Sequence, residues 1–234
     1  MEILIVSTSK IHGTSYMAYL LDEVKDFFTG KNEILFIPYA RPGGISYDEY
    51  TTMPRAAFEE VGIKVRGIHE YDDPVNAVKE AKGIFTGGGN TFLLLKTLYD
   101  NGLIEPLRQA VKSGTPYMGS SAGSNITGLT IGTSNDMPIV YPPSFDALQL
   151  VPFNINPHYL DPDPNSKHQG ETREMRINEF HFQNTQPVIG LREGSWLKVK
   201  NNTIELKGEL DARLFEKGRE PREVAPGDVS FLIG

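Results

Sequence analysis

The chain has 234 residues, of which 39% are hydrophobic and 23% are charged, as is usual for a globular protein. Its formal net charge of -7 argues against nucleic acid or an anionic membrane as a partner, because both attract basic surfaces. The absence of cysteine excludes disulfides, thiolate zinc sites and cysteine nucleophiles. At this length we expect one α/β domain over residues 1–234. We expect it in the cytoplasm, because the first residues do not resemble a secretory signal and no apolar run is long enough to span a membrane.

Strand-like and helix-like segments alternate through the first half of the sequence. Short apolar runs are separated by segments whose apolar residues recur at helical spacing. This alternation predicts a doubly wound, mostly parallel sheet with helices on both faces. The expected strands are 2–6, 34–38, 63–68, 83–86 and a run ending at Gly119, and the expected helices are 15–28, 50–61, 74–82, 91–99 and 104–112.

The pattern changes beyond Gly190. Short segments that alternate apolar and polar residues follow one another, separated by Asn-Asn, Gly and Pro-Gly turns. Such segments are typical of antiparallel strands. We therefore expect an antiparallel addition to the edge of the sheet, formed by residues 196–200, 203–206, 213–215 and 229–233.

The sequence Gly119-Ser-Ser-Ala-Gly123 has the G-x-S-x-G spacing of a nucleophile elbow. It follows a strand-like run and precedes a helix-compatible one. In such an elbow a tight turn lifts the serine clear of the sheet, and small neighbours keep the turn free of collisions. Ser121 is therefore the candidate nucleophile. Ala122 would be the first residue of the next helix, and its backbone N–H is a candidate oxyanion donor.

A second turn of small residues, Gly87-Gly-Gly-Asn90, also follows a predicted strand. Ligands bind at the carboxyl ends of strands in parallel sheets, so this turn and Ser121 are expected on the same rim. We expect Gly88 or Gly89 to supply a second oxyanion donor. We expect Asn90 to cap the next helix or to contact the substrate. A simple tight turn is the alternative, whereas a phosphate-binding loop lacks its Lys-Ser/Thr pair and its G-x-G-x-x-G spacing.

A serine nucleophile needs a base, and His158 fits this role best. It ends the extended apolar stretch 148–157 and should therefore emerge at a strand end. A core or turn histidine is the alternative interpretation. The remaining histidines have less favourable surroundings: His12, His69, His168 and His181.

The base in turn needs a carboxylate that orients it, and two candidates remain. Asp136 lies in a polar loop after the elbow, which would give the Ser, Asp, His order of α/β-hydrolases. Glu193 follows the apolar run 187–191 and would lie at a strand end. Either residue could instead be a loop carboxylate that caps nearby N–H groups. The sequence does not choose between them.

Six blocks of the sequence, taken together, resemble a known family. They are Gly-Gly-Gly-Asn-Thr-Phe at 87–92, Ser-Ala-Gly-Ser-Asn at 121–125, Asn-Asp-Met-Pro-Ile-Val at 135–140, Phe-Asp-Ala-Leu at 145–148, Ile-Asn-Pro-His at 155–158 and Gly-Glu-Thr-Arg-Glu at 170–174. Their order and spacing resemble peptidase E, the α-aspartyl dipeptidase family of serine peptidases, which also includes the cyanophycinases. The resemblance runs from the first strand to at least Trp196.

The resemblance implies a flavodoxin-like sheet related to class I glutamine amidotransferases, with serine in place of their cysteine. It implies hydrolysis of dipeptides with an N-terminal aspartate, without metal or cofactor. By matching motif, Ser121 is the nucleophile, His158 the base, and Asp136 or Glu193 the acid partner. Two features depart from the family. Ser120 stands where a tryptophan is common, which would open the pocket wall, and the Pro- and Asp-rich loop 159–169 would change substrate access.

An N-terminal aspartate presents a side-chain carboxylate and an ammonium group to its site. Arg173 and Arg176 lie three residues apart on an expected helix face. Without the resemblance, a solvated helix paired with Glu171 and Glu174 is the simpler interpretation. With it, Arg173 is the expected clamp for the substrate carboxylate, because a guanidinium fork matches two oxygens.

Three other functions are compatible with the sequence. One is a hydrolase of another aspartyl linkage, such as the β-Asp-Arg bond of cyanophycin. The second is a metal hydrolase that uses His158, Asp161, Asp163 and His168. The third is a non-catalytic domain that binds a small ligand. The expected partner is a small-molecule substrate, and the sequence leaves the oligomeric state, monomer or dimer, open.

Overall fold

A computed structural model describes residues 1–163, 165 and 170–233, and its main feature is an eight-stranded sheet. Five of the strands are parallel and lie in the order β3-β2-β4-β5-β1. Three antiparallel strands, β8, β9 and β12, continue the sheet beyond β1. The parallel strands are β1 (Glu2–Val6), β2 (Glu33–Ile37), β3 (Lys64–Gly67), β4 (Ile84–Thr86) and β5 (Tyr117–Ser120), and the antiparallel ones are β8 (Trp196–Lys200), β9 (Thr203–Lys207) and β12 (Gly227–Asp228).

The parallel strands have a flavodoxin-like arrangement in which the first strand of the chain takes the fifth place. The flavodoxin-like strand order is 2-1-3-4-5. Here β3, β2, β4 and β5 take the first four places of that order, and β1 takes the last place, beside β5. Side chains alternate between the two faces, so that Ile3 and Ile5 enter one apolar cluster while Leu4 and Val6 enter the other. The fold predicted from the alternation of elements is confirmed.

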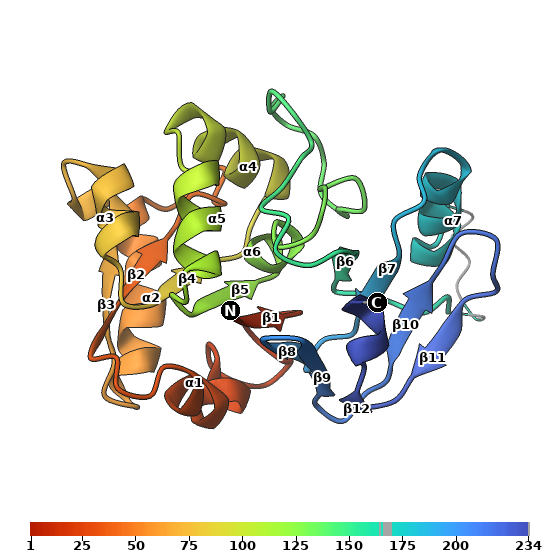
Figure 1. The fold of residues 1–234 in the computed structure, drawn as a ribbon, viewed down its shortest axis with the longest axis horizontal. Helices are drawn as coiled ribbons and strands as arrows, with labels where there is room; N and C mark the ends of the chain where they lie inside the picture. Colours follow the sequence, from red (N-terminus) through yellow and green to blue (C-terminus); the bar gives the residue numbers. More distant parts are fainter. Residues whose placement is uncertain (164, 166–169, 234) are drawn as a thin grey trace.

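Helices cover both faces of this sheet (Figure 1). On one face lie α3 (Pro74–Glu80), α4 (Thr91–Asp100) and α5 (Ile104–Lys112). On the other lie α1 (Leu21–Phe27), preceded by the short 3₁₀ helix Ala18–Leu20, and α2 (Tyr47–Glu59). Helix α2 begins earlier than predicted because the Ser46 hydroxyl accepts from the Glu49 N–H while the Glu49 carboxylate accepts from the Ser46 N–H. A second 3₁₀ helix, Ile68–Glu70, follows β3.

A second sheet of four strands stands beside the first, in the order β11-β10-β7-β6 (Figure 1). Strands β6 (Asn154–Pro157) and β7 (Val188–Leu191) are parallel, while β10 (Ala212–Phe215) and β11 (Arg222–Val224) are antiparallel additions. Helix α7 (Arg173–Gln183) packs Ile177 against Val188 and Phe215 of this sheet. The two sheets meet where β5 of the first and β6 of the second flank the short helix α6 (Ala122–Asn125).

The carboxyl-terminal part of the chain differs from its prediction in two respects. Strands β8 and β9 extend the edge of the large sheet as expected, but β10 belongs to the second sheet. Residues 229–233 were expected as a strand, whereas Ser230–Ile233 form a 3₁₀ helix. The Asp228 carboxylate accepts from the Ser230 N–H at 2.9 Å, and this local turn ends the ladder after β12. Among the described residues, no helix is both long and apolar enough to cross a bilayer.

Candidate active site

Ser121 occupies a strained turn between β5 and α6. Its backbone angles are φ 53° and ψ -111°, a combination that side-chain-bearing residues rarely adopt. The flanking glycines make the turn possible. A Cβ atom on Gly119 would lie 2.2 Å from the Gly123 carbonyl oxygen, and one on Gly123 would lie 2.1 Å from that of Thr86. The small residues of the motif are therefore required by close backbone packing, and they present the hydroxyl at the carboxyl end of β5.

His158 lies directly after β6 and faces this hydroxyl. Its Nε2 atom is 2.9 Å from the Ser121 Oγ atom. The histidine backbone is also in the left-handed region, with φ 54°. The two side chains come from different sheets, so the pair bridges the junction of the two. The structure thus brings together the predicted nucleophile and base.

Glu193, from the turn after β7, completes a row of three hydrogen-bonded side chains, Ser121, His158 and Glu193. Its Oε1 atom is 2.7 Å from the other ring nitrogen, Nδ1, of His158. Strands β6 and β7 are in register with Pro157 opposite Leu191, so the turns that follow them emerge side by side. The His158 and Glu193 side chains are 35% and 47% exposed, which leaves the row open to a ligand.

Asp136, the other candidate for the acid partner, does not face the histidine. One of its carboxylate oxygens, Oδ2, accepts from the Thr91 backbone N–H at 2.7 Å and from the Thr91 hydroxyl at 2.6 Å. Thr91 is the first residue of α4, where free N–H groups favour a carboxylate. The expectation that Asp136 orients His158 is therefore corrected. The structure gives that position to Glu193 and makes Asp136 part of the cap of α4.

The glycine-rich turn lies against the nucleophile. A Cβ atom on Gly88 would lie 3.0 Å from the Ser121 Cβ atom, and Gly89 has φ 143°. The Tyr50 hydroxyl donates to the Gly88 carbonyl oxygen at 2.9 Å. Within the described part of the chain, no acceptor binds the backbone N–H groups of Gly88, Gly89 or Ala122. These donors therefore remain available beside the Ser121 hydroxyl.

Asn90 follows the first of its two predicted roles. Its side-chain oxygen accepts from the Leu93 N–H at 3.0 Å and caps α4. Its side-chain nitrogen donates to the Met137 carbonyl at 2.9 Å, which ties the loop containing Asp136 to the rim. Both ends of the amide are thus engaged, and the expected contact with substrate is not supported by this geometry.

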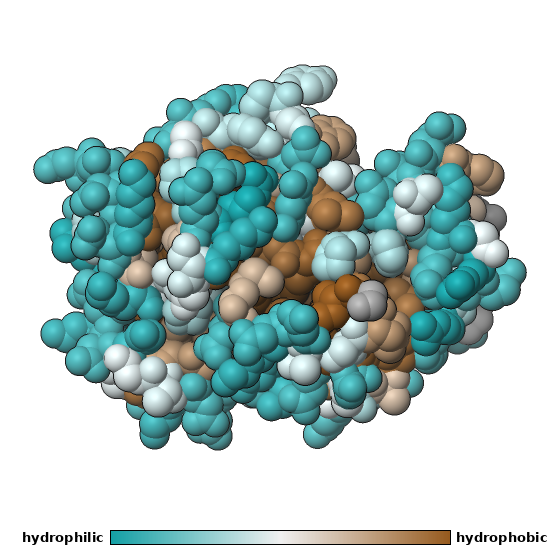
Figure 2. All heavy atoms as spheres, in the orientation of Figure 1, coloured by the Kyte–Doolittle hydropathy of each residue, from teal (hydrophilic) through white to brown (hydrophobic). Residues whose placement is uncertain are grey.

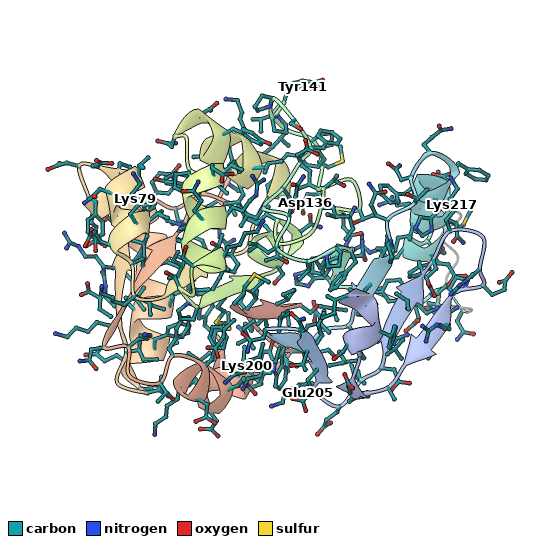
Figure 3. The ribbon with its side chains drawn as sticks, viewed as in Figure 1. Lys79, Asp136, Tyr141, Lys200, Glu205 and Lys217 are labelled. Atoms are coloured by element: carbon teal, nitrogen blue, oxygen red, sulfur yellow. The ribbon has the colours of Figure 1, made fainter. Side chains whose placement is uncertain are left out.

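Arg173 is the first residue of α7, and its side chain lies across from the loop that carries Asp136. Burial is the main cause that lowers its pKa, the Arg176 charge lowers it further, and the Asp136 carboxylate raises it. Within the described residues, no carboxylate lies within 4.0 Å of its guanidinium, whereas Arg176 pairs with Glu171 at 3.5 Å. Glu174, the other expected partner, pairs with Arg213 instead. Figure 3 shows Asp136 and Tyr141 on the loop that rises between α4 and α7.

A hollow of about 460 Å³ adjoins this arginine. It is lined by the amino end of α7 and by residues 160–163, which follow His158 closely. In Figure 2 the outline of the molecule is indented between the part that contains α4 and the part that contains α7. Arg173 therefore lines an open hollow, and the Asp136 carboxylate is near enough to act on its charge.

The other histidines are placed elsewhere or lie outside the described residues. His69 bonds to Asp48 at 2.9 Å, His181 bonds to the Gln186 carbonyl at 2.9 Å, and His168 is not among the residues described. The described residues contain no group of three or more histidines and carboxylates that could hold a metal. Asp161, a ligand in the alternative metal-hydrolase interpretation, accepts both arms of the Arg192 fork, at 2.8 and 2.7 Å.

Two further residues modify the sequence-based picture. Ser120 is fully buried in β5, so its side chain does not face solvent, and the expectation of a more open pocket wall stays a prediction. Arg192, which sequence reasoning missed, binds both Asp161 and Glu223 and thereby ties the residue before Glu193 to the start of loop 159–169 and to β11. The sequence did hold a signal for Arg192, because this residue lies between the end of a predicted strand and the candidate Glu193.

Comparison with known proteins agrees with the fold and identifies the family. The profile of peptidase family S51 matches residues 3–207. A Streptomyces coelicolor protein named peptidase E is 52% identical over 234 residues, which cover 100% of this chain and 95% of that protein. A Drosophila melanogaster protein named probable alpha-aspartyl dipeptidase is 45% identical, covering 99% of this chain and 97% of its own length. The crystal structure of a peptidase from an acI-B1 actinobacterium shares the fold, with a TM-score of 0.73 and 18% identity over 96% of this chain and 93% of that one. The resemblance read from the motifs is confirmed, and the chain belongs to peptidase family S51, a family of serine peptidases.

Proposed function

We propose that this protein is a serine-type dipeptidase that hydrolyses dipeptides with an N-terminal aspartate. The observation that carries the proposal is the row of hydrogen bonds from Ser121 through His158 to Glu193. The names of the relatives supply the substrate class. Because the nucleophile and its base come from different sheets, residues 1–234 would act as one catalytic domain. The cytoplasmic location stays a prediction.

In this mechanism His158 works at both of its ring nitrogens. Nε2 takes the Ser121 proton as Oγ attacks the carbonyl carbon that follows the substrate aspartate. Glu193 accepts from Nδ1–H, fixes the tautomer that leaves Nε2 free to accept, and stabilises the imidazolium once it forms. His158 then protonates the leaving amine, the peptide C–N bond breaks, and an aspartyl ester of Ser121 remains. Water, deprotonated by His158, hydrolyses the ester and regenerates the serine.

The tetrahedral intermediate carries its negative charge on the former carbonyl oxygen. Ala122 is the first residue of α6, directly after the nucleophile, and Gly88, in the turn that follows β4, packs against Ser121. Donors aimed at an oxyanion from two sides stabilise it more in the transition state than in the ground state. We assign the oxyanion site to Ala122 and to the turn at Gly88 and Gly89.

The two charges of an N-terminal aspartate have complementary groups at the mouth of the site. Arg173 offers a partly buried guanidinium without a described carboxylate partner, which suits the side-chain carboxylate of the substrate. Asp136 offers a negative charge on the opposite side of the same mouth, which suits the ammonium. This pairing would favour aspartate over asparagine and would select a free amino terminus.

A panel of dipeptides tests the function directly. Asp-Leu should be cleaved, whereas Asn-Leu, Glu-Leu and N-acetyl-Asp-Leu should be cleaved at least about a hundredfold less efficiently. Asn-Leu lacks the side-chain charge, N-acetyl-Asp-Leu lacks the ammonium charge, and the carboxylate of Glu-Leu lies one methylene farther out. Ser121→Ala should lose turnover by several orders of magnitude yet still bind aspartate, and Ser120→Ala should change turnover much less. A β-Asp-Arg dipeptide distinguishes the cyanophycin-type linkage. Equal cleavage by Ser121→Ala, or no cleavage of Asp-Leu by the wild-type protein, would refute the proposal.

A further inference from the structure

Tyr50, a residue of α2 outside the Ser121–His158–Glu193 row, reaches the glycine-rich turn through the protein core. Its side chain is 1% exposed, and its hydroxyl donates to the Gly88 carbonyl oxygen at 2.9 Å. Gly87 makes room for this contact, since a Cβ atom there would lie 2.4 Å from the Tyr50 hydroxyl oxygen. The first glycine of the turn is thus required by a tyrosine that lies 37 positions earlier in the chain.

The remainder of the turn is fixed by backbone contacts. Gly87 N–H donates to the Ile37 carbonyl at 3.2 Å, and Asn90 N–H donates to the Ala40 carbonyl at 2.6 Å. Gly89 packs so closely on Ala40 that a Cβ atom would lie 2.2 Å from its carbonyl oxygen. These bonds secure the two ends of the turn on the chain that follows β2. They leave the peptide plane between Gly88 and Gly89 to be oriented by the tyrosine.

We propose that Tyr50 is a positioning residue that sets the oxyanion site by orienting the Gly88–Gly89 peptide. A trans peptide directs its C=O and its N–H to opposite edges, so a carbonyl turned toward Tyr50 turns the Gly89 N–H away from it. The Cβ position of Gly88 lies against Ser121, whereas its carbonyl oxygen faces Tyr50 of α2. This inference rests on the proposed role of the turn as an oxyanion donor, and it adds the group that holds the donor in place.

The surroundings of Tyr50 suit a permanent donor. Burial raises the pKa of its hydroxyl, so the group stays protonated throughout the working range. The Arg41 guanidinium lies 4.5 Å from the centre of the Tyr50 ring, and the Phe36 ring packs edge-on at 5.3 Å. Both contacts involve the ring and would survive removal of the hydroxyl. The substitution Tyr50→Phe therefore keeps the ring and removes only what the hydroxyl makes, namely its hydrogen bond to Gly88 and its interactions with the Arg41 and Tyr16 side chains.

The test measures how fast a small fluorophosphonate labels Ser121. In this reaction the Ser121 Oγ–P bond forms, fluoride leaves and the hydroxyl proton passes to His158, while charge builds on the phosphoryl oxygen in the oxyanion site. Because removing one oxyanion donor lowers rates by about 10²–10³, a misdirected donor should slow labelling about tenfold or more in Tyr50→Phe. The same loss should appear in kcat on Asp-Leu with KM changed less than about twofold, since the ground state is untouched.

Two controls separate positioning from a purely structural role. Tyr47→Phe, on the first turn of the same helix and 37% exposed, should leave the labelling rate and the unfolding midpoint unchanged. Placing 4-aminophenylalanine at position 50 keeps the ring and restores an N–H donor, and it should restore labelling to within about threefold of wild type. Labelling by Tyr50→Phe within twofold of wild type, or no recovery with the amino analogue, would overturn the inference. Failure of wild-type protein to cleave Asp-Leu would refute the proposed substrate and leave the labelling comparison valid.

Discussion

The backbone N–H of His158 donates to the Ser7 hydroxyl oxygen at 3.0 Å, and the same hydroxyl donates to the Leu191 carbonyl at 2.8 Å. Ser7 directly follows β1, is fully buried, and links this end of β1 to the ends of the neighbouring strands β6 and β7 of the second sheet. One hydroxyl thus sets the position of the histidine relative to the strand that precedes Glu193. The alignment of the base depends on this junction.

We expect Ser7→Ala to reduce both stability and turnover. The substitution leaves a buried N–H and a buried C=O without a partner, which should cost about 1–3 kcal/mol of unfolding free energy. A shift of the imidazole by a fraction of an ångström should lower kcat about tenfold. Denaturant unfolding and initial rates measure the two effects, with Ser113→Ala at an exposed position as the matched control. Normal kcat in a destabilised Ser7→Ala protein would limit Ser7 to a structural role.

Glu193→Gln should impair catalysis far more than Asp136→Asn does. An amide at position 193 can donate to Nδ1 and so favour the tautomer that cannot accept the Ser121 proton, for which a loss in kcat on the order of 10²–10⁴ is expected. Asp136→Asn weakens the cap of α4, at a cost of about 1 kcal/mol, and removes the proposed partner of the substrate ammonium, so KM should rise. Steady-state kinetics on Asp-Leu check both variants. A larger fall in kcat for Asp136→Asn would return Asp136 to the role of acid partner.

The choice between these two carboxylates shows where sequence reasoning stops. Asp136 lies in a predicted polar loop and Glu193 follows a predicted strand, so the local sequence pattern supports both residues equally as the acid partner. The difference lies in strand pairing, since Pro157 is opposite Leu191 in neighbouring strands and the next residues emerge together. The spacing of apolar residues along the sequence carries no information about how two strands are paired. The elements that depend on periodicity alone, such as β1 and α5, have the predicted bounds.

The second sheet and Tyr50 were beyond prediction for a similar reason. Alternation identified β10 as a strand but placed it wrongly at the edge of the large sheet, and β11 and β12 span only three and two residues. Tyr50 was predicted as part of an amphipathic helix, and nothing local indicates that its hydroxyl reaches a carbonyl 38 residues away. The motifs did identify Ser121 and His158, because an elbow has strict steric requirements that can be read from small residues.

Arg173→Lys should raise KM for aspartyl dipeptides by about tenfold or more while the protein stays folded. Lysine keeps the charge but loses the fork that matches two carboxylate oxygens. Arg176→Lys is the matched control, because the Arg176 side chain is 54% exposed and already pairs with Glu171. Kinetics on Asp-Leu and thermal unfolding of both variants provide the measurement. Unchanged kcat/KM in Arg173→Lys would remove this arginine from the substrate site.

A partly buried carboxylate on α1 should make stability depend on pH. Burial raises the pKa of Glu23, but hydrogen bonds and charges from Lys198 and Lys207 outweigh it, so the net pKa lies below the usual value of 4.5. A lowered pKa means that the folded protein binds the proton less readily than the unfolded chain does. The stabilisation is therefore complete above the ordinary pKa and is lost as the pH falls through the lowered one.

Glu23→Gln removes this carboxylate with little change in shape and leaves two lysines of the β8–β9 hairpin without their shared partner. We expect a loss of about 1–3 kcal/mol in unfolding free energy at pH 7, because the Glu23 side chain is only 10% exposed. The difference from wild type should shrink as the pH is lowered below 4.5, since the wild-type carboxylate then takes up its proton. Urea unfolding of both proteins across this range measures the difference. A gap that stays constant with pH would show that the ionised form of Glu23 contributes no net stability, and the effect of the substitution would then come from packing alone.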